Sequence, residues 1–239
     1  MILTEVSGNL YPCLPIQPNT ERAHSLLVIT GCEVMKLGIF GGTFDPIHNA
    51  HLMLAEQCLE QCALDEVWFL PAGSPPHKSR FELAESHHRL RMVELAIAGH
   101  TRFAVSSYEV DRSGSSYTVE TLEQLHHDHQ GHQMFFLMGS DSLREFHTWR
   151  SPERILQLAQ IVVVQRADTI SIDDFEKTGS PEEILLFTTH PPVVEIPAMG
   201  ISSTDCRKRV QENRSIRYLV PRSVECYIET HGLYQDPGK

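Results

Sequence analysis

The stretch Lys36-Leu-Gly-Ile-Phe-Gly-Gly-Thr-Phe-Asp-Pro-Ile-His-Asn-Ala-His51 decides the fold of this chain. Its first five residues predict a short apolar strand, and the apolar spacing from His51 to Leu64 predicts a helix. The turn between them is rich in glycine, and His48 and His51 are three residues apart, so they share one face of the helix start. Because the free N–H groups of a helix N-terminus attract anions, this arrangement predicts an anion-binding site.

The rest of the chain alternates between apolar strands and helical patterns. Predicted strands are Lys36–Phe40, Val67–Leu70, Phe103–Val105, Met134–Met138, Ile161–Val164, Ile184–Phe187 and Val193–Ile196. Predicted helices are Ser86–Ala98, Thr118–His127, Pro152–Leu158, Ser203–Asn213 and Arg222–Thr230. This alternation predicts an α/β fold with a doubly wound, mainly parallel sheet and helices on both faces. In such sheets ligands bind beyond the carboxyl ends of the strands, where the strand order reverses.

The first 34 residues differ from the rest in composition. Pro12, Pro15 and Pro18 lie close together, which disfavours a helix or a central strand. We expect residues 1–34 to be a flexible N-terminal extension and residues 35–239 to be a single domain, with Met35 as a candidate start of the functional chain. The apolar run before Cys32 has four residues and is too short for an export signal, which needs about 7–15. Residues 168–183 are polar and predict a surface excursion.

The composition excludes several classes of protein. The chain has 239 residues, with 20 basic and 31 acidic side chains and a net charge of −11, which disfavours binding to nucleic acid or to an anionic membrane. No run of 18 apolar residues exists, so no membrane-spanning helix is expected. The six cysteines contain no CxxC pair and predict buried thiols in a reduced, cytoplasmic protein. Positive groups that bind phosphate must therefore be gathered locally.

Common nucleotide and metal motifs are absent or incomplete. No GxGxxG fingerprint follows the first strand, and the spacing from Gly73 to Lys78 is one residue short of a P-loop. Asp45, His48 and His51 could instead bind a transition metal, although no HExxH pattern accompanies them. The four histidines within residues 126–132 favour a solvated turn over a metal site.

Five motifs in order carry a resemblance to a known family. Residues 41–51 resemble the nucleotidyltransferase signature GGTFDPxHxGH, with Ala50 where the family has glycine. The others are Ser74–Lys78, Gly114–Leu122, Gly139–Asp141 followed by Trp149, and Ile201–Arg207. Together they resemble the bacterial nicotinate-nucleotide adenylyltransferases over residues 36–231. The resemblance implies a Rossmann-like nucleotidyltransferase fold and transfer of AMP from ATP to nicotinate mononucleotide.

The resemblance also implies roles for individual residues. It implies that the groups acting on the phosphates are His48, His51, Lys78 and Arg207. ATP binding is implied for Gly41, Gly42, Thr43, Asp141, Ser203 and Thr204, and acceptor binding for Thr118 and Trp149. Without the resemblance, the hydroxyls at helix starts would be caps, Trp149 a packing residue and Lys78 a surface lysine. Magnesium is expected to be held mainly by ATP and water, with no metal site in the protein itself.

Three alternatives stay open on sequence alone. The same fold could serve nicotinamide mononucleotide or phosphopantetheine as the acceptor. The chain could be a non-catalytic nucleotide-binding protein that keeps the glycine-rich loop. A metal hydrolase that uses Asp45, His48 and His51 belongs to a third class. The oligomeric state is not predicted.

Overall fold

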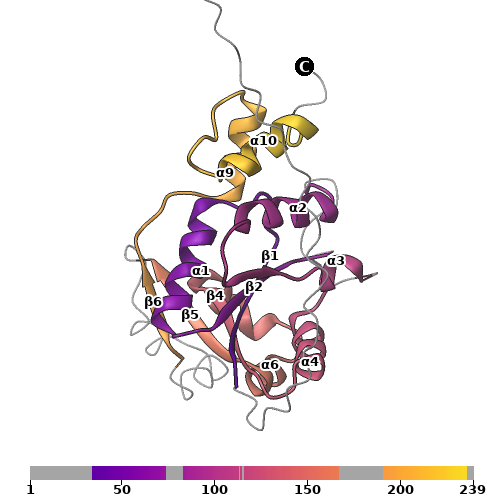
Figure 1. The fold of residues 1–239 in the computed structure, drawn as a ribbon, viewed down its shortest axis with the longest axis vertical. Helices are drawn as coiled ribbons and strands as arrows, with labels where there is room; N and C mark the ends of the chain where they lie inside the picture. Colours follow the sequence, from indigo (N-terminus) through magenta and orange to yellow (C-terminus); the bar gives the residue numbers. More distant parts are fainter. Residues whose placement is uncertain (1–33, 74–82, 113, 115, 167–190, 236–239) are drawn as a thin grey trace, which may run out of the picture. The chain divides into compact units, whose positions relative to one another are not determined.

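Six parallel strands form one sheet in the computed structural model, which describes residues 34–73, 83–112, 114, 116–166 and 191–235 (Figure 1). The sheet order is β3-β2-β1-β4-β5-β6, and each neighbouring pair is parallel. The strands are β1 Lys36–Gly42, β2 Glu66–Pro71, β3 Phe103–Val105, β4 Gln133–Gly139, β5 Gln160–Arg166 and β6 Val193–Ile196. The predicted doubly wound parallel sheet is confirmed.

Helices connect these strands at the positions that the apolar spacing predicts. They are α1 Asn49–Gln61, α2 Ser86–Ile97, α3 Tyr108–Asp111, α4 Thr118–Asp128, α5 Ser140–Glu145, α6 Pro152–Leu158, α9 Ser203–Gln211 and α10 Arg222–His231. A 3₁₀ turn, Phe146–Thr148, follows α5. The helices α3 and α5 were not predicted, because four and six residues are too few to show a helical period. No helix in the described part of the chain has the length and hydrophobicity that crossing a membrane requires.

The two faces of the sheet carry separate hydrophobic cores. Along β1 the side chains alternate, so that Leu37 and Ile39 belong to one core and Phe40 belongs to the other. The core that contains Phe40 is covered by α1, α2, α9 and α10. The opposite core is covered by α4 and α6 (Figure 1) and by α5. Both faces are therefore buried, as the near-continuous apolar strands require.

The strand order reverses between β1 and β4. From β1 the chain first builds outward through β2 to β3, and it then crosses to β4 on the other side of β1 and continues to β6. The carboxyl ends of β1 and β4 thus lie next to each other, with helices leaving them toward opposite faces. This is the position at which a doubly wound sheet leaves room for a ligand.

Several predictions fall on residues outside the described ranges. These are the extension over residues 1–34 apart from Val34, the polar excursion over 168–183, the strand Ile184–Phe187, and Lys78. They stay predictions.

Candidate active site

A cavity of about 330 Å³ lies at the point where the strand order reverses. Its polar lining comes from the start of α1, the end of β4 and the start of α9, namely His48, His51, Ser140, Ser202 and Ser203. Its apolar lining is Leu54, Val164, Ile196, Met199 and Ile201. Ala50, which stands where the family signature has glycine, also lines this cavity. The mixture of donors and apolar surface suits a ligand with an anionic part and a flat apolar part.

His48 and His51 form one stacked unit at the start of α1. The ring centroids are 3.6 Å apart and the ring planes differ by 14°. His48 is the N-cap residue, and its backbone N–H donates to Nδ1 of His51 at 3.2 Å. Because Nδ1 of His51 accepts this bond, we assign the proton of the neutral ring to Nε2. The shared helix face predicted from the spacing is confirmed, and it leaves Nε2–H of His51 as a donor for a ligand.

Burial keeps both imidazoles uncharged. It lowers the pKa of His48 to about 4. It also lowers the pKa of His51 well below its ordinary value, and a charge on the adjacent His48 would lower it further. Near neutral pH the pair therefore offers neutral hydrogen-bond donors rather than two cations.

The depressed pKa of His48 makes stability depend on pH in a defined direction. The unfolded chain binds a proton near pH 6.5, whereas the folded ring resists protonation until about pH 4. The neutral ring therefore contributes fully above pH 6.5, and this contribution is lost as the pH falls toward 4. Asparagine is a good N-cap that does not titrate, so we expect His48→Asn to lose less stability than the wild type between pH 7 and pH 4.5. Urea unfolding at several pH values measures this; equal losses in the two proteins would contradict it.

The loop between β1 and α1 is held in place by Phe44. Its backbone has a φ of 49°, in the left-handed region that non-glycine residues seldom occupy. The Phe44 ring packs edge-on against Phe40 at 5.3 Å and against the His51 ring at 5.2 Å. A Cβ on Gly42 would lie 2.8 Å from the Phe44 ring, whereas a Cβ on Gly41 would make an ordinary contact at 3.6 Å. The glycine at position 42 is thus required by the protein's own packing, independently of any nucleotide.

This contrast between the two glycines predicts different stabilities for two matched variants. Gly42→Ala forces the Phe44 ring out of its place and is expected to lower the free energy of unfolding by about 1–3 kcal/mol. Gly41→Ala meets only the Phe136 ring at ordinary distance, so we expect a clearly smaller loss. Urea denaturation of both variants tests this, and an equal loss in both would show that the packing of Phe44 does not constrain position 42.

The buried side chain of Asp45 helps to hold the same loop in place. Its side chain is 1% exposed, and Oδ1 accepts hydrogen bonds from the Tyr234 hydroxyl at 2.6 Å and the Ala84 N–H at 3.2 Å. The backbone carbonyl of Asp45 accepts from Nη1 of Arg207 at 2.7 Å, and the same nitrogen lies 3.8 Å from Oδ2. These contacts fix the loop from three distant parts of the chain.

The N-terminus of α9 is fixed against this loop. Ser202 is the N-cap, and its side chain accepts from the Asp205 N–H at 3.1 Å. The hydroxyl of Ser203 donates to the Pro46 carbonyl at 2.9 Å, and Oγ1 of Thr204 accepts from Nη2 of Arg207 at 3.4 Å. The capping role falls to Ser202, so Ser203 is available to join the loop to α9.

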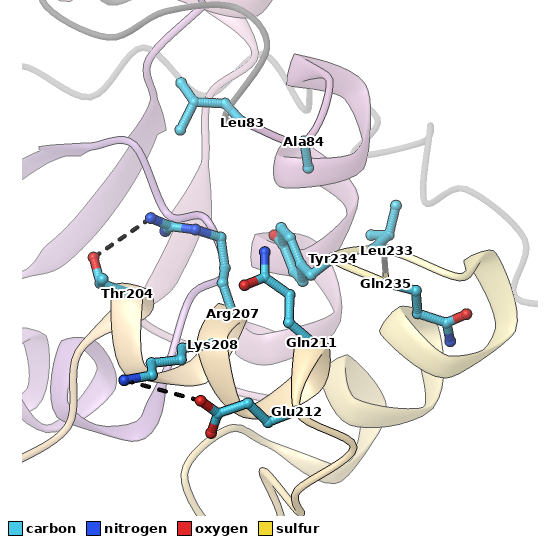
Figure 2. Close-up of a pocket in the computed structure, with 10 residues that line it drawn as sticks. All are labelled: Leu83, Ala84, Thr204, Arg207, Lys208, Gln211, Glu212, Leu233, Tyr234 and Gln235. Carbon is cyan, nitrogen blue, oxygen red and sulfur yellow. Dashed lines mark hydrogen bonds and ion pairs between the residues drawn. The ribbon is translucent and has the colours of Figure 1, made fainter. Parts of the chain in front are cut away.

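Arg207 faces a second cavity and not the one lined by the histidines. This second cavity measures about 860 Å³ and is lined by Thr204, Arg207 and Gln211 of α9 and by Tyr234 after α10 (Figure 2). Arg207 and the histidine pair therefore approach the loop from different sides. They are linked through the backbone of Asp45, and neither cavity contains both groups.

The residues predicted to hold the acceptor lie elsewhere. Thr118 is the first residue of α4, and Trp149 is half-buried against Phe136 at 5.9 Å and Phe146 at 5.5 Å. Neither lines the histidine cavity, and the contacts of Trp149 are those of a packing residue. Asp141 is the second residue of α5, directly after two residues that line that cavity.

The described residues do not gather into a metal site. No group of three or more His, Cys, Asp or Glu side chains that could hold an ion occurs among them. Oδ1 of Asp45 accepts from Tyr234 and Ala84, and Asp45 does not line the cavity of His48 and His51.

Of the four histidines predicted to form a solvated turn, His126 and His127 are exposed on α4, whereas His129 and His132 are half-buried. The His129 ring packs edge-on against Trp68 at 4.8 Å, and Nδ1 of His132 accepts from the Met35 N–H at 3.4 Å.

Arg89 and Tyr234 also hold the loop, and neither was predicted from the sequence. Arg89 is 2% exposed on α2, and Nη1 donates to the Thr43 carbonyl at 2.8 Å. The signal for Arg89 was present, because it stands on the apolar face of its helix with Met92 and Val93 at the i+3 and i+4 positions. Tyr234 gives no such signal, since it follows the last helix.

Comparisons with known proteins agree with the geometry. Residues 39–209 match the model of the cytidylyltransferase-like family. A probable nicotinate-nucleotide adenylyltransferase of Desulfitobacterium hafniense is 41% identical over 202 residues, which are 84% of this chain and 96% of that protein. One of Thermomicrobium roseum is 43% identical over 203 residues, covering 84% and 92%. The solved Plasmodium falciparum nicotinic acid mononucleotide adenylyltransferase complexed with NaAD shares the fold, with a TM-score of 0.66, 21% identity, and coverage of 84% and 97%.

Proposed function

We propose that this chain, which belongs to the nicotinate-nucleotide adenylyltransferases within the cytidylyltransferase-like family, transfers AMP from ATP to nicotinate mononucleotide, giving nicotinate adenine dinucleotide and pyrophosphate. The observation that carries this proposal is the stacked pair His48 and His51 at the start of α1, which lines the same cavity as Gly139 at the carboxyl end of β4. The pair supplies neutral donors to an anion at the place where a doubly wound sheet binds its ligands.

The chemical character of the cavity lining suits the parts of ATP. The apolar side chains Val164, Ile196 and Ile201 offer a surface for the adenine ring. Asp141, the second residue of α5, is proposed to bind the ribose, and the N-terminus of α9 favours negative charge. The triphosphate would then run past the start of α1 toward the two histidines.

The transfer itself needs positioning and charge stabilisation and no covalent nucleophile. A phosphate oxygen of the mononucleotide attacks the α-phosphorus of ATP in line, forming the new P–O bond. The bond from the α-phosphorus to the oxygen that bridges to the β-phosphorus breaks, and that oxygen leaves with pyrophosphate. Nε2–H of His51 and the His48 ring are proposed to donate to the phosphoryl oxygens as their charge grows.

Other groups complete the proposed site. Lys78, outside the described residues, is proposed as a point cation for the phosphates, and Thr43 as a further contact. Arg207 is proposed to act on the triphosphate tail from the α9 side of the loop. Thr118 and Trp149 stay as candidate contacts to the nicotinate side.

Magnesium is part of the proposal as a companion of ATP. The side chains that line the histidine cavity are imidazoles, hydroxyls and alkyl groups, whereas magnesium prefers several oxygen ligands and keeps its waters. These residues therefore suit a magnesium ion that is bound by the triphosphate and not by protein side chains. When bound, it would neutralise part of the phosphate charge.

The choice of acceptor is the part of the proposal most in need of a test, since the histidine loop would serve any nucleotidyl transfer. We propose measuring kcat/KM with ATP and magnesium for nicotinate mononucleotide, nicotinamide mononucleotide and phosphopantetheine, with product masses read directly. The proposal expects nicotinate mononucleotide to be preferred and pyrophosphate to form only when both substrates are present. Tight ATP binding without pyrophosphate release would identify a nucleotide-binding protein instead.

A reducing compartment suits the thiols, and we propose that the protein works in the cytoplasm. Four described cysteines, Cys58, Cys62, Cys206 and Cys226, are free. Burial raises the pKa of Cys58 to about 12 and that of Cys206 to about 11, which makes these thiols unreactive.

A further inference from the structure

The charged side chain of Arg89 is buried, where a charge carries a large desolvation cost. It lies on α2 and is 2% exposed, although it lines neither cavity. Removing a guanidinium from water costs several kcal/mol unless hydrogen bonds replace the lost water. Burial lowers the pKa of Arg89, and the negative charge of Asp45 acts in the opposite direction. The three hydrogen bonds that Arg89 donates offset this cost, and an apolar residue could not make them.

Within the described residues, each hydrogen bond that Arg89 donates goes to a backbone carbonyl in the segments around the site. Nε donates to the Ala84 carbonyl at 3.0 Å, Nη1 to the Thr43 carbonyl at 2.8 Å, and Nη2 to the Gly73 carbonyl at 2.9 Å. Thr43 opens the loop that leads to His48, and Gly73 lies just after β2. One planar, rigid fork thus fixes three peptide groups relative to one another.

Asp45 completes the arrangement from the other side. The Ala84 carbonyl accepts from Arg89 while the Ala84 N–H donates to Oδ1 of Asp45, so Ala84 is held at both ends. Asp45 and Thr43 are two residues apart in the glycine-rich loop. Arg89 binds the loop at the Thr43 carbonyl, and the Ala84 N–H binds it at the Asp45 side chain. The loop contains no regular structure of its own between β1 and α1, so these contacts set where its peptides lie.

We propose that Arg89 is a positioning residue for adenylyl transfer, which holds the Thr43 peptide and thereby the loop from which His48 and His51 act. This inference rests on the proposed function. An error of about 1 Å in the position of a catalytic group can cost about 100-fold in rate. Because the histidines act on charge that grows in the transition state, misplacing their loop should lower kcat more than it raises KM for ATP.

The test compares Arg89→Lys with the matched variant Arg91→Lys. Lysine keeps the charge but cannot donate to three carbonyls in one plane. Arg91 lies on the same helix with an exposed side chain paired to Glu94 at 2.7 Å, so its replacement should change nothing. For Arg89→Lys we expect kcat and kcat/KM for ATP to fall together by about 10–100-fold, with KM nearly unchanged, at a temperature where the variant is fully folded.

A second readout does not depend on activity. The amide that follows the Thr43 carbonyl is that of Phe44, and its NMR shifts report the hydrogen bond from Arg89. We expect these shifts to move in Arg89→Lys and to stay in Arg91→Lys. A folded Arg89→Lys enzyme with wild-type kcat would overturn the inference, and a wild type that makes no dinucleotide would overturn the proposed function instead. Arg89→Gln is the second variant; if neither Arg89 variant folds, Arg89 serves the fold alone and the inference is likewise overturned.

Discussion

Replacing His51 by asparagine is expected to lower turnover by about 10²–10³-fold while leaving the protein folded. The Oδ1 atom of asparagine can take the place of Nδ1 and accept the His48 N–H, which is donated at 3.2 Å in the wild type. The variant therefore keeps the helix start and loses the donor at Nε2. Steady-state kinetics with ATP and nicotinate mononucleotide measures the loss, and circular dichroism checks the fold.

Glutamine at position 51 separates the two roles of the ring. Its terminal amide reaches the place of Nε2 and restores a donor, so His51→Gln should recover part of the activity that His51→Asn loses. His48→Ala is expected to be as damaging as His51→Asn, because it removes the other ring of the stacked pair. His127→Ala, on the exposed surface of α4, serves as the control. Wild-type turnover in His51→Asn would rule out the proposed contact with the phosphates.

The largest loss of stability is expected from Asp45→Ala. Asp45 is buried, its Oδ2 lies 3.8 Å from Nη1 of Arg207, and its negative charge also acts on the buried guanidinium of Arg89. Removing it leaves that charge unbalanced and removes the acceptor of Tyr234 and Ala84. Breaking a buried pair in this way costs about 3–5 kcal/mol, which corresponds to a melting temperature lower by roughly 10 °C in a domain of this size. Calorimetry measures the shift.

A neutral variant of Asp45 and a control on the surface identify the cause of this loss of stability. Asp45→Asn keeps an oxygen for Tyr234 and Ala84 and loses only the charge, so we expect a smaller loss than in Asp45→Ala. Asp128 is exposed, and its carboxylate accepts from Gln124 at 2.8 Å, so Asp128→Ala should cost less than about 0.5 kcal/mol. Equal melting temperatures for Asp45→Ala and the wild type would show that the buried carboxylate does not stabilise the loop.

Most of the fold could be predicted, because strands and long helices leave a period in the sequence. The predicted ranges Phe103–Val105, Pro152–Leu158 and Val193–Ile196 are confirmed to the residue. Helix α1 begins at Asn49, two residues before the predicted start, because the N-cap is His48. The short helices α3 and α5 could not be predicted, because so few residues show no helical period and their conformation depends on packing against neighbouring elements.

The candidate site could be predicted only where its residues are close together in the chain. The spacing of His48 and His51 is enough to place them on one helix face, and the stacking of the rings follows from it. The separation of Arg207 from the cavity of the histidines could not be foreseen, because it depends on how α9 packs on the loop. The contacts of Arg89 go to backbone carbonyls, which carry no side-chain pattern in the sequence at all.

The hydrogen bond between Asp45 and Tyr234 joins residues 189 positions apart. The Asp45 carboxylate can therefore meet the phenol only after residue 234 has left the ribosome. A nascent or prematurely terminated copy lacks that closure even when every strand has been synthesised. In such a copy the loop between β1 and α1, which leads to His48 and His51, lacks one of the hydrogen bonds that hold Asp45.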